Sequence, residues 1–248
     1  MNLKPVKDVL TIAALKSIPD FKRQPLMLIM IGLISSIPLF FILVFGGSGQ
    51  IGYGLVGAMV STISFIGIAA AIQDIAVDRY LKIREMIVAM PVHPISYAVG
   101  VALAPLVISA PSLIFFTAIA IWLKVLPLSS IGWIIASLLL CWTTLSSIGF
   151  IISTYLHKAS VYTLNSMSNI LGLGLIFIPP VYYPEELLGG LSWIAMIFPT
   201  SNAAGLIRAY SGSLQLPPEI ILVRWLILIA VTLVSIIIVS LKAKWTEV

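Results

Sequence analysis

Five long stretches without a charged residue constrain the fold of this chain more than any other feature. They cover residues 24–73, 86–123, 125–157, 159–184 and 225–241. A helix that spans a membrane needs about 20 apolar residues. Only 9% of the 248 residues are charged, whereas a soluble domain has roughly a quarter. The sequence therefore predicts an all-α, polytopic membrane protein that forms a single domain over residues 1–248.

Turn-forming residues divide these stretches into six predicted spans. The run Gly46-Gly-Ser-Gly-Gln-Ile-Gly52 separates the first span from the second, because its glycines allow backbone angles that other residues avoid. The predicted spans are residues 26–45, 53–73, 97–122, 131–155, 161–178 and 220–241. The third span contains Pro105 and Pro111, and we expect it to be kinked because proline lacks a backbone donor.

The basic residues predict the orientation of the spans. With six spans both termini lie on one side, which then carries 11 of the 14 lysines and arginines. The other side carries Lys124, Arg208 and Arg224. Because cytoplasmic loops are enriched in Lys and Arg, both termini are predicted to lie in the cytoplasm. The spans are predicted to cross the cell membrane. This asymmetry also explains the net charge of +5 without a nucleic-acid partner.

Two segments outside the spans are predicted to lie at the membrane surface. In residues 1–23, Val6, Val9, Leu10 and Ala13 recur at helical spacing, which predicts an interfacial helix over 5–17; an ordinary basic tail is the alternative. In residues 179–218, the apolar stretch 187–198 is too short to span a membrane. A re-entrant or interfacial helical hairpin on the outer side fits this second segment.

Enzyme motifs are absent from the sequence. There is no phosphate-binding loop of the type G-x-x-x-x-G-K-[ST], so any use of ATP requires another polypeptide. The histidines His93 and His157 have no neighbouring cysteine or paired carboxylate, and Cys141 is the only cysteine. We therefore expect no metal, no cofactor bound by this chain and no catalytic residue.

The spans contain neutral polar residues but no charge in their interiors. A carrier driven by an ion gradient usually keeps an ionisable group at membrane depth, so this class is disfavoured. Asp74 and Arg224 lie near span ends, where extension of the side chain to the interface is the simplest interpretation. The neutral polar residues either line a pathway or join helices by hydrogen bonds; they are Ser61, Ser64, Thr143, Thr144, Ser146, Ser147, Asn165, Ser168 and Asn169.

The second loop, residues 74–96, contains a predicted amphipathic helix. Its apolar residues Tyr80, Ile83, Ile87 and Met90 recur every three or four positions, and Pro91 ends the pattern. An apolar face surrounded by charges suits docking to a cytoplasmic partner protein. The alternative is a helix that packs against the bilayer.

Two motifs give the chain a resemblance to a known family. The second loop carries Glu85 followed by Pro91-Val92, and the outer segment carries Pro179-Pro-Val-Tyr-Tyr-Pro-Glu-Glu-Leu-Leu188, Phe198-Pro199-Thr200 and then Arg208. Both motifs, in this order, resemble permeases of the ABC-2 family, the membrane subunits of ATP-binding-cassette transporters. Lys82-Ile83 replaces the family's Gly-Thr in the loop, and Phe198 replaces an asparagine in the outer segment.

The resemblance implies a transport subunit that is not itself an enzyme. A cytoplasmic ABC ATPase would bind the ATP and Mg²⁺, and a second copy of the chain or a similar permease would complete a dimer that exports its substrate. The implied ATPase contact consists of Asp78, Arg79, Ile83, Arg84, Glu85, Ile87, Met90 and Pro91. The implied extracellular gate consists of Pro184, Glu185, Trp193, Phe198, Pro199 and Arg208. A scaffold that recruits a cytoplasmic partner without transport, and an ion-driven carrier, remain the alternative functions.

Overall fold

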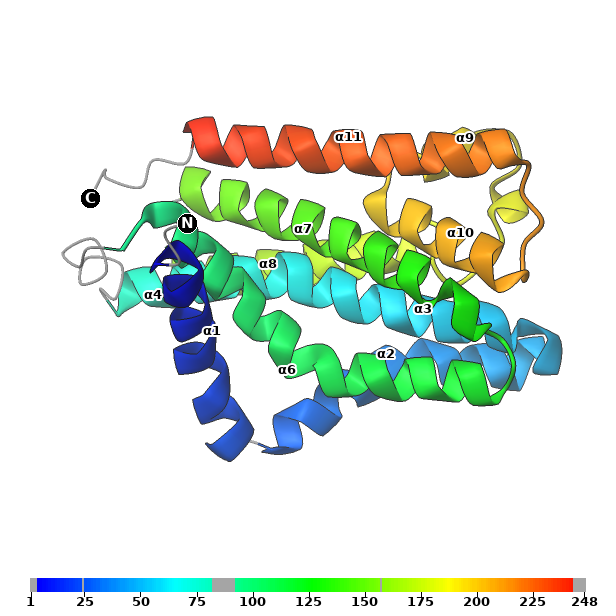
Figure 1. The fold of residues 1–248 in the computed structure, drawn as a ribbon, viewed down its shortest axis with the longest axis horizontal. Coiled ribbons are helices and arrows are strands. Elements are labelled where there is room, and N and C mark those ends of the chain that lie inside the picture. The colour runs from blue at the N-terminus through cyan, green and yellow to red at the C-terminus, as the bar shows by residue number, and fades with distance from the viewer. Residues whose placement is uncertain (1–3, 24, 82–91, 157, 243–248) are drawn as a thin grey trace.

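The computed structural model describes residues 4–23, 25–81, 92–156 and 158–242, and this part of the chain contains helices and no strand (Figure 1). The helices at the start of the chain are α1 (Lys4–Arg23), α2 (Pro25–Gly46), α3 (Ile51–Ser64) and α4 (Ala71–Tyr80). They are followed by α6 (Pro94–Trp122), α7 (Ile131–Tyr155), α8 (Val161–Phe177), α9 (Ser192–Ala195), α10 (Pro199–Ser211) and α11 (Pro218–Lys242). The all-helical membrane fold predicted from the uncharged stretches is confirmed.

Four helical stretches are long and apolar enough to cross a membrane. They are Ile51–Tyr80, Ile95–Trp122, Leu128–Tyr155 and Pro218–Leu241. Two further apolar helices in the described residues, Gly32–Gly46 and Val161–Phe177, are shorter. They overlap the predicted first and fifth spans, and the count of six spans remains a prediction. α6 continues through Pro105 and Pro111 and changes direction along its length (Figure 1).

Local sequence signals explain where several helices begin and end. His93 precedes α6, and its ring nitrogen accepts a hydrogen bond from the amide of Ile95 at 3.3 Å. Ser160 precedes α8, and its hydroxyl accepts a hydrogen bond from the amide of Thr163 at 3.1 Å. Gly212 ends α10 with a φ of 76°, a left-handed conformation that glycine adopts without strain.

The most deeply buried helical stretch contains a wide turn. α3 and α4 are joined by the π-helix η2 (Phe65–Ala70), so that Ile51–Tyr80 is one continuous element. Two glycines allow α7 to approach this element closely: a Cβ atom on Gly67 or Gly149 would lie 2.9 Å from the Cβ atom of Leu145 or Ala71, respectively. A π-helical turn was not predicted, and such turns are frequent at functional sites.

The bundle has two distinct ends. Figure 1 shows the start of α1, the end of α11, the last turn of α4 and the start of α6 at one end, here called the N/C end. The turn between α6 and α7 lies at the opposite end with α9 and α10, here called the far end. Lys124 belongs to the α6–α7 turn, whereas Lys158 belongs to the connection between α7 and α8 at the N/C end. This separation matches the two sides that the basic residues predict.

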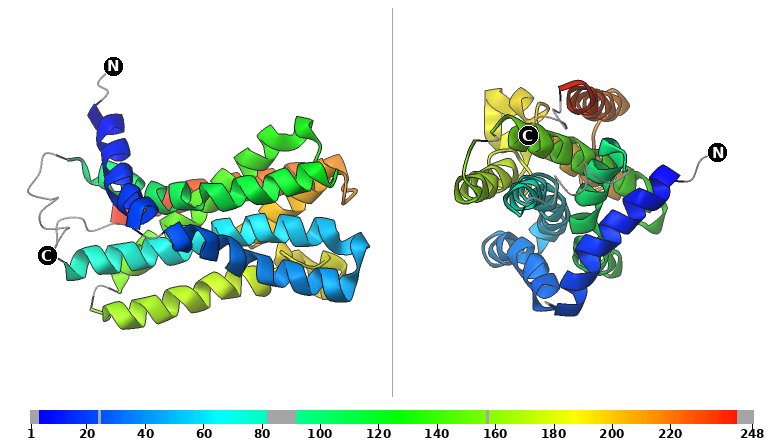
Figure 2. Two further views of the ribbon diagram at one scale, coloured as in Figure 1. Left: turned by 90° about the horizontal axis from the view of Figure 1, so that it is seen from below. Right: turned by 90° about the vertical axis from the view of Figure 1, so that its left-hand side faces the viewer.

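α1 lies across the bundle rather than along it. Both views in Figure 2 show α1 running at a steep angle to the other helices. It packs closely on α6, because a Cβ atom on Gly100 would lie 2.8 Å from the Cβ atom of Ile12. The helix is longer than the predicted 5–17 and leaves Val6, Leu10 and Leu15 exposed. Its place at a membrane interface remains a prediction.

The outer segment 179–218 is arranged differently from the expectation. The apolar helix expected within 187–198 is reduced to the 3₁₀ turns of η4 (Glu185–Leu191) and the four-residue α9, with Gly189 in a left-handed conformation at φ 54°. The main helix of the segment is α10, and its first ten residues are all buried. Small residues such as Ala203, Ala204 and Gly205 allow α10 to fit between α3, α7 and α11.

Candidate functional site

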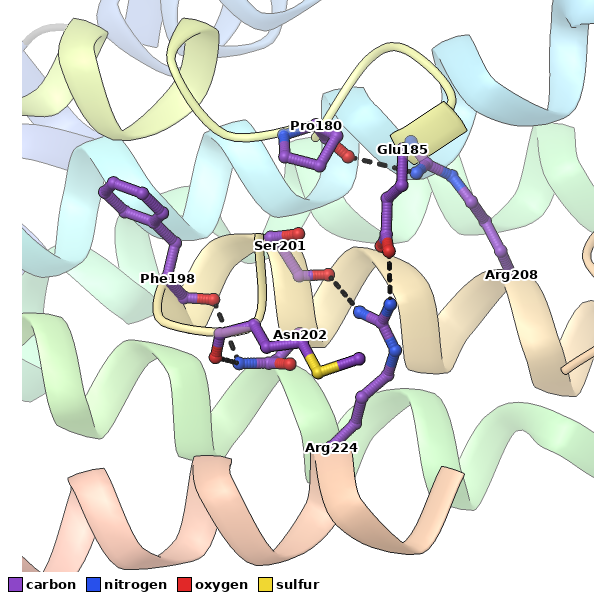
Figure 3. A network of polar contacts seen from close by, with 8 residues as sticks. Pro180, Glu185, Phe198, Ser201, Asn202, Arg208 and Arg224 are labelled. Atoms are coloured by element: carbon purple, nitrogen blue, oxygen red, sulfur yellow. Dashed lines mark hydrogen bonds and ion pairs between the residues drawn. The ribbon is translucent and has the colours of Figure 1, made fainter. Parts of the chain in front are cut away.

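At the far end, a buried ion pair connects the outer segment to the last helix. Arg224 of α11 is 1% exposed, and its Nη2 lies 2.5 Å from Oε2 of Glu185 at the start of η4 (Figure 3). Its Nη1 also donates a hydrogen bond of 3.5 Å to the carbonyl of Ser201 in α10. Arg224 therefore joins three elements that are distant in the sequence.

A second buried arginine holds the chain that leaves α8. Arg208 of α10 is 1% exposed and donates hydrogen bonds to the carbonyls of Pro180, at 3.1 Å, and Val181. Its guanidinium lies 4.3 Å from the centre of the Tyr53 ring in α3. Burial lowers the pKa of Arg208 to about 10, an effect that Tyr53 and Glu185 partly oppose. The group therefore remains charged at neutral pH.

These contacts define the far-end network: Tyr53, Glu185, Arg208 and Arg224. It contains two buried guanidinium groups and one paired carboxylate, so its positive charge is only partly compensated. Because every member comes from a different element, separation of η4 from α11 would break the ion pair. Such a network can connect the position of the outer segment to that of the helices around it.

The structure brings together some of the residues predicted for the outer gate. Glu185 and Arg208 belong to the far-end network, and Pro184 immediately precedes η4. Phe198 immediately precedes α10, whose first residue is Pro199. The carbonyl of Phe198 accepts a hydrogen bond of 3.2 Å from the side-chain amide of Asn202. Trp193 is 59% exposed and lies outside the network.

Arg224 was missed as a member of this site. Its position near the start of the last span favoured a side chain extended to the interface, whereas the structure buries it. One signal in the sequence could have indicated this pair. Glu185 is one of the few charged residues predicted on the same side of the membrane as Arg224, and its charge is opposite.

A cluster of hydroxyl groups joins α2, α3 and the segment after α8. Thr62 Oγ1 donates a hydrogen bond of 2.8 Å to Ser35 Oγ, and Ser61 Oγ shares one of 2.7 Å with the hydroxyl of Tyr182. Tyr182 also contacts the carbonyl of Ser35 at 3.1 Å. These four residues, here called the hydroxyl cluster, border a small cavity of about 70 Å³ between α2, α3, η2 and α8. Ser61 was one of the polar residues expected either to line a pathway or to join helices; here its hydroxyl links α3 to the segment after α8.

At the N/C end, a second buried carboxylate connects three helices. Asp78 of α4 is 2% exposed and forms an ion pair of 2.8 Å with Lys16 of α1. Lys16 contacts both oxygens of this carboxylate, and the hydroxyl of Tyr97 in α6 donates a hydrogen bond to Oδ2. Asp78, Lys16 and Tyr97 are here called the N/C-end network.

Only two residues of the predicted ATPase contact fall in the described part of the chain. Asp78 is buried against α1 and α6, and Nη2 of Arg79 donates a hydrogen bond of 2.6 Å to the carbonyl of Ser153 in α7. Both side chains contact the chain's own helices, which differs from the open rim expected for them. Six predicted contact residues lie outside the described residues: Ile83, Arg84, Glu85, Ile87, Met90 and Pro91.

The described residues contain no group of three or more His, Cys, Asp or Glu side chains that could hold a metal ion.

Comparison with known families shows to which family the chain belongs. The sequence model of the ABC-2 type transporter family matches residues 9–211. This range includes most of α1, the N/C-end network, the hydroxyl cluster and every residue of the far-end network except Arg224. No curated protein and no solved structure matches the chain. Because the match covers most of the sequence, the chain belongs to the ABC-2 type transporter family.

Proposed function

We propose that the protein is the permease subunit of an ABC transporter and exports a substrate across the cell membrane. The family match over residues 9–211 carries this proposal. ATP would be bound and hydrolysed with Mg²⁺ by a separate cytoplasmic ATPase. In this arrangement α2, the α3–α4 element, α6, α7, α8 and α11 are the six spans, and the N/C end faces the cytoplasm. The excess of basic residues predicted for that side supports the orientation.

Docking of the ATPase is proposed for the second loop, residues 74–96. α4 ends at Tyr80, at the N/C end, which is the side proposed to face a cytoplasmic partner (Figure 1). A partner that moves this loop would also act on Asp78 and Arg79, whose contacts reach α1, α6 and α7. These contacts offer a direct route from the loop into the bundle.

A dimer with a second copy, or with a similar permease, is proposed to form along α2 and α8. Both helices expose large apolar side chains: Phe40, Phe41 and Phe45 on α2, and Ile170, Leu173 and Phe177 on α8. The hydroxyl cluster lies beside this surface, between α2, α3 and α8. A pathway at the dimer axis would then pass the hydroxyl contacts that Ser35 of α2 makes with Thr62 of α3 and with Tyr182 after α8.

The far-end network is proposed to close the extracellular end of that pathway. The outer segment rests on Arg208 and Arg224, and opening would require η4 to separate from α11. Arg208→Ala should therefore alter transport, or the ATP turnover stimulated by cargo, while binding of the ATPase is retained. An unchanged transport rate would reduce Arg208 to a structural residue.

The first experiment is co-purification of the ATPase together with ATP hydrolysis in the presence of cargo. Ile87→Asp should abolish most co-purification, because an unpaired carboxylate in a desolvated contact costs about 2–5 kcal/mol. Glu85→Lys should have a smaller effect, since charges at a rim contribute less than buried apolar anchors. Leu128→Asp, at an exposed apolar residue of the far end, is the matched control and should co-purify normally.

The outcomes separate the possible functions. Normal co-purification by Ile87→Asp would remove the second loop from the mechanism. ATPase recruitment without stimulation by any cargo would indicate a scaffold, and transport that depends on a proton gradient without an ATPase would indicate an ion-driven carrier.

Orientation can be tested with single cysteines at Lys158 and Lys124 in a Cys141→Ser background. An impermeant reagent should label them from opposite sides of the membrane.

A further inference from the structure

Four of the five tryptophans in the described residues lie at the far end of the bundle. Trp122 is the last residue of α6, and Trp133 is the third residue of α7. Trp225 is the eighth residue of α11, and Trp193 belongs to α9 of the outer segment. The fifth, Trp142, lies in the middle of α7. α2 and α8, which are proposed to form the dimer surface, contain no tryptophan.

Three aromatic rings at the far end join α7, α10 and α11, and are here called the aromatic cluster. The ring of Trp133 stacks on that of Tyr210, with centroids 5.4 Å apart and planes inclined by 5°. The ring of Trp225 meets that of Trp133 edge-on at 6.0 Å, and its Nε1 donates a hydrogen bond of 3.0 Å to the Tyr210 hydroxyl. Ser130 Oγ donates a further one of 2.6 Å to the carbonyl of Tyr210. These contacts hold the rings at one level of the bundle.

The far-end tryptophans present apolar surface to the surroundings of the bundle. Trp122 and Trp133 are 80% and 54% exposed, and Trp193 is exposed as well. The outer segment adds further exposed apolar side chains, namely Leu187, Leu191 and Ile197. An indole ring combines a large apolar surface with one N–H donor, so it is most stable between hydrocarbon and water. This surface is therefore suited to the headgroup region of a membrane.

The spacing of exposed aromatic residues along α7 matches the thickness of a bilayer. Tyr155, the last residue of α7, is exposed at the N/C end, as are Tyr80 at the end of α4 and Tyr162 near the start of α8. Trp133 and Tyr155 are 22 positions apart, which corresponds to about 33 Å at 1.5 Å per residue. A hydrocarbon core is about 30 Å thick, and Trp and Tyr are enriched at both of its boundaries. α7 thus has an aromatic residue at the level of each boundary.

A lipid surface fits this arrangement better than a protein partner does. The anchors of a protein interface gather near the centre of one patch. Figure 1 shows the last turn of α6 and the first turns of α11 on opposite sides of the bundle, so Trp122 and Trp225 belong to different faces. What these residues share is the end of the bundle at which they lie, as expected for residues at a membrane boundary.

We propose that the far end docks into the headgroup region of membrane phospholipids through its tryptophans. The interfacial surface consists of Trp122, Trp133, Trp193 and Trp225. Trp193 places the outer segment on the membrane surface, and Glu185 of the same segment binds Arg224, the neighbour of Trp225. The membrane and the far-end network therefore hold the same segment. This inference depends on the membrane location of the chain and not on its proposed role in export.

The first test measures how deeply single tryptophans lie in vesicles of phosphatidylcholine brominated at a defined position of the acyl chains. The full chain is reconstituted without an ATPase, and every other tryptophan is replaced by phenylalanine. Bromine quenches tryptophan fluorescence only at short range, so the most effective bromine position reports the depth of the ring. We expect Trp133 and Trp193 to be quenched about twofold more by bromine near the ester than by bromine near the chain end.

The matched control lies on the same helix. Leu139→Trp, in a chain whose native tryptophans are all phenylalanine, places a ring at an exposed position six residues, or about 9 Å, from Trp133 toward the middle of α7. It should show the reverse order, with stronger quenching by bromine near the chain end. Equal depth profiles for Trp133 and Leu139→Trp would overturn the proposal, and so would a Trp193 that no brominated lipid quenches.

A second measurement keeps the native tryptophans and does not depend on the folding of the chain without them. A nitroxide is attached to Leu191→Cys in a Cys141→Ser background, and its collision rate with a water-soluble nickel complex is measured in the same vesicles. Trp193→Ala should raise this rate about twofold, because the outer segment loses its anchor. Tyr162→Ala, at an exposed ring of the N/C end, is the control and should leave the rate unchanged. A rate unaffected by Trp193→Ala would contradict docking of the outer segment on lipid.

Discussion

The two ends of the bundle each contain a buried carboxylate paired with a cation, but the pairs are constructed differently. At the far end, Glu185 faces Arg224, which is 1% exposed, and a second buried arginine, Arg208, lies in the same network. At the N/C end, Asp78 faces Lys16, whose side chain is 24% exposed, and Tyr97 supplies a neutral donor. The far end therefore buries more charge than the N/C end.

This difference predicts different responses to movement. A buried guanidinium that loses its carboxylate has no water to replace it, so the far-end network should be either intact or fully broken. Lys16 can remain hydrated when it leaves Asp78, so α1 can separate from α4 at lower cost. The N/C end is thus suited to graded adjustment beside the second loop, and the far end to two distinct states.

The largest expected effect is that of Glu185→Gln. It leaves Arg224 and Arg208 buried without a carboxylate partner, which should lower the free energy of unfolding by about 3 kcal/mol. The measurement is the midpoint of SDS denaturation in mixed micelles. Glu186→Gln, at the exposed neighbouring carboxylate, is the control and should change stability by less than about 0.5 kcal/mol. Equal effects of the two variants would contradict the comparison.

A smaller effect is expected for Asp78→Asn. The amide still accepts a hydrogen bond from Tyr97, and Lys16 can turn to water, so the loss should be about 1.5–2 kcal/mol. Since Lys16 belongs to α1, this helix should separate from α6 more often. A cysteine at the buried Ala13 of α1, in a Cys141→Ser background, should then be labelled faster by a thiol reagent.

The control for this experiment is Asp8→Asn, which changes another carboxylate of the same region without touching the N/C-end network. It should leave the labelling rate at residue 13 unchanged. A rate that does not differ between Asp78→Asn and the wild type would show that the network does not hold α1 in place.

Much of the fold could be predicted because helix boundaries in a membrane protein follow from composition. The predicted span 131–155 coincides with α7, and the predicted last residues of the third and fifth spans fall within one residue of the last residues of α6 and α8. Uncharged stretches indicate where the helices lie, and Gly, Pro and Ser indicate where they begin and end, so the boundaries can be read from the local sequence. α10 was not predicted, since its residues Pro199–Ser211 are too polar and too small to resemble a span.

The candidate site was predicted less completely because it depends on contacts between distant residues. Glu185 and Arg224 are 39 positions apart, and Lys16 and Asp78 are 62 positions apart. No local pattern indicates either pair, so Arg224 was interpreted as interfacial and Asp78 as part of a docking surface. The π-helix η2 likewise depends on the close approach of α7 at Gly67 and Gly149, which tertiary packing decides.

Between the two charged networks, the neutral hydroxyl cluster should contribute less than either. Tyr182→Phe removes the hydroxyl that contacts Ser61 and the carbonyl of Ser35, and it should lower stability by about 1 kcal/mol. Tyr162→Phe, whose ring is 81% exposed, should have no measurable effect in the same SDS denaturation. A loss for Tyr182→Phe as large as that for Glu185→Gln would mean that charge does not distinguish the far end.

The smallest expected effect is the dependence of the two ion pairs on salt. Salt screens charges that reach solvent and has little influence on buried ones, with a screening length of about 30 Å at 0.01 M and about 3 Å at 1 M. Lys16 is partly exposed and Arg224 is not, so only the N/C-end pair should weaken. The stability difference between the wild type and Asp78→Asn should therefore shrink by a few tenths of a kcal/mol, about the size of a surface pair, when salt rises from 0.01 M to 1 M. The difference for Glu185→Gln should stay constant over the same range.

Each variant is compared with the wild type at the same salt concentration, so that the effect of salt on the micelles cancels. If the stability difference for Glu185→Gln falls with salt as much as that for Asp78→Asn, water reaches Arg224. The two ends would then not differ in their access to solvent.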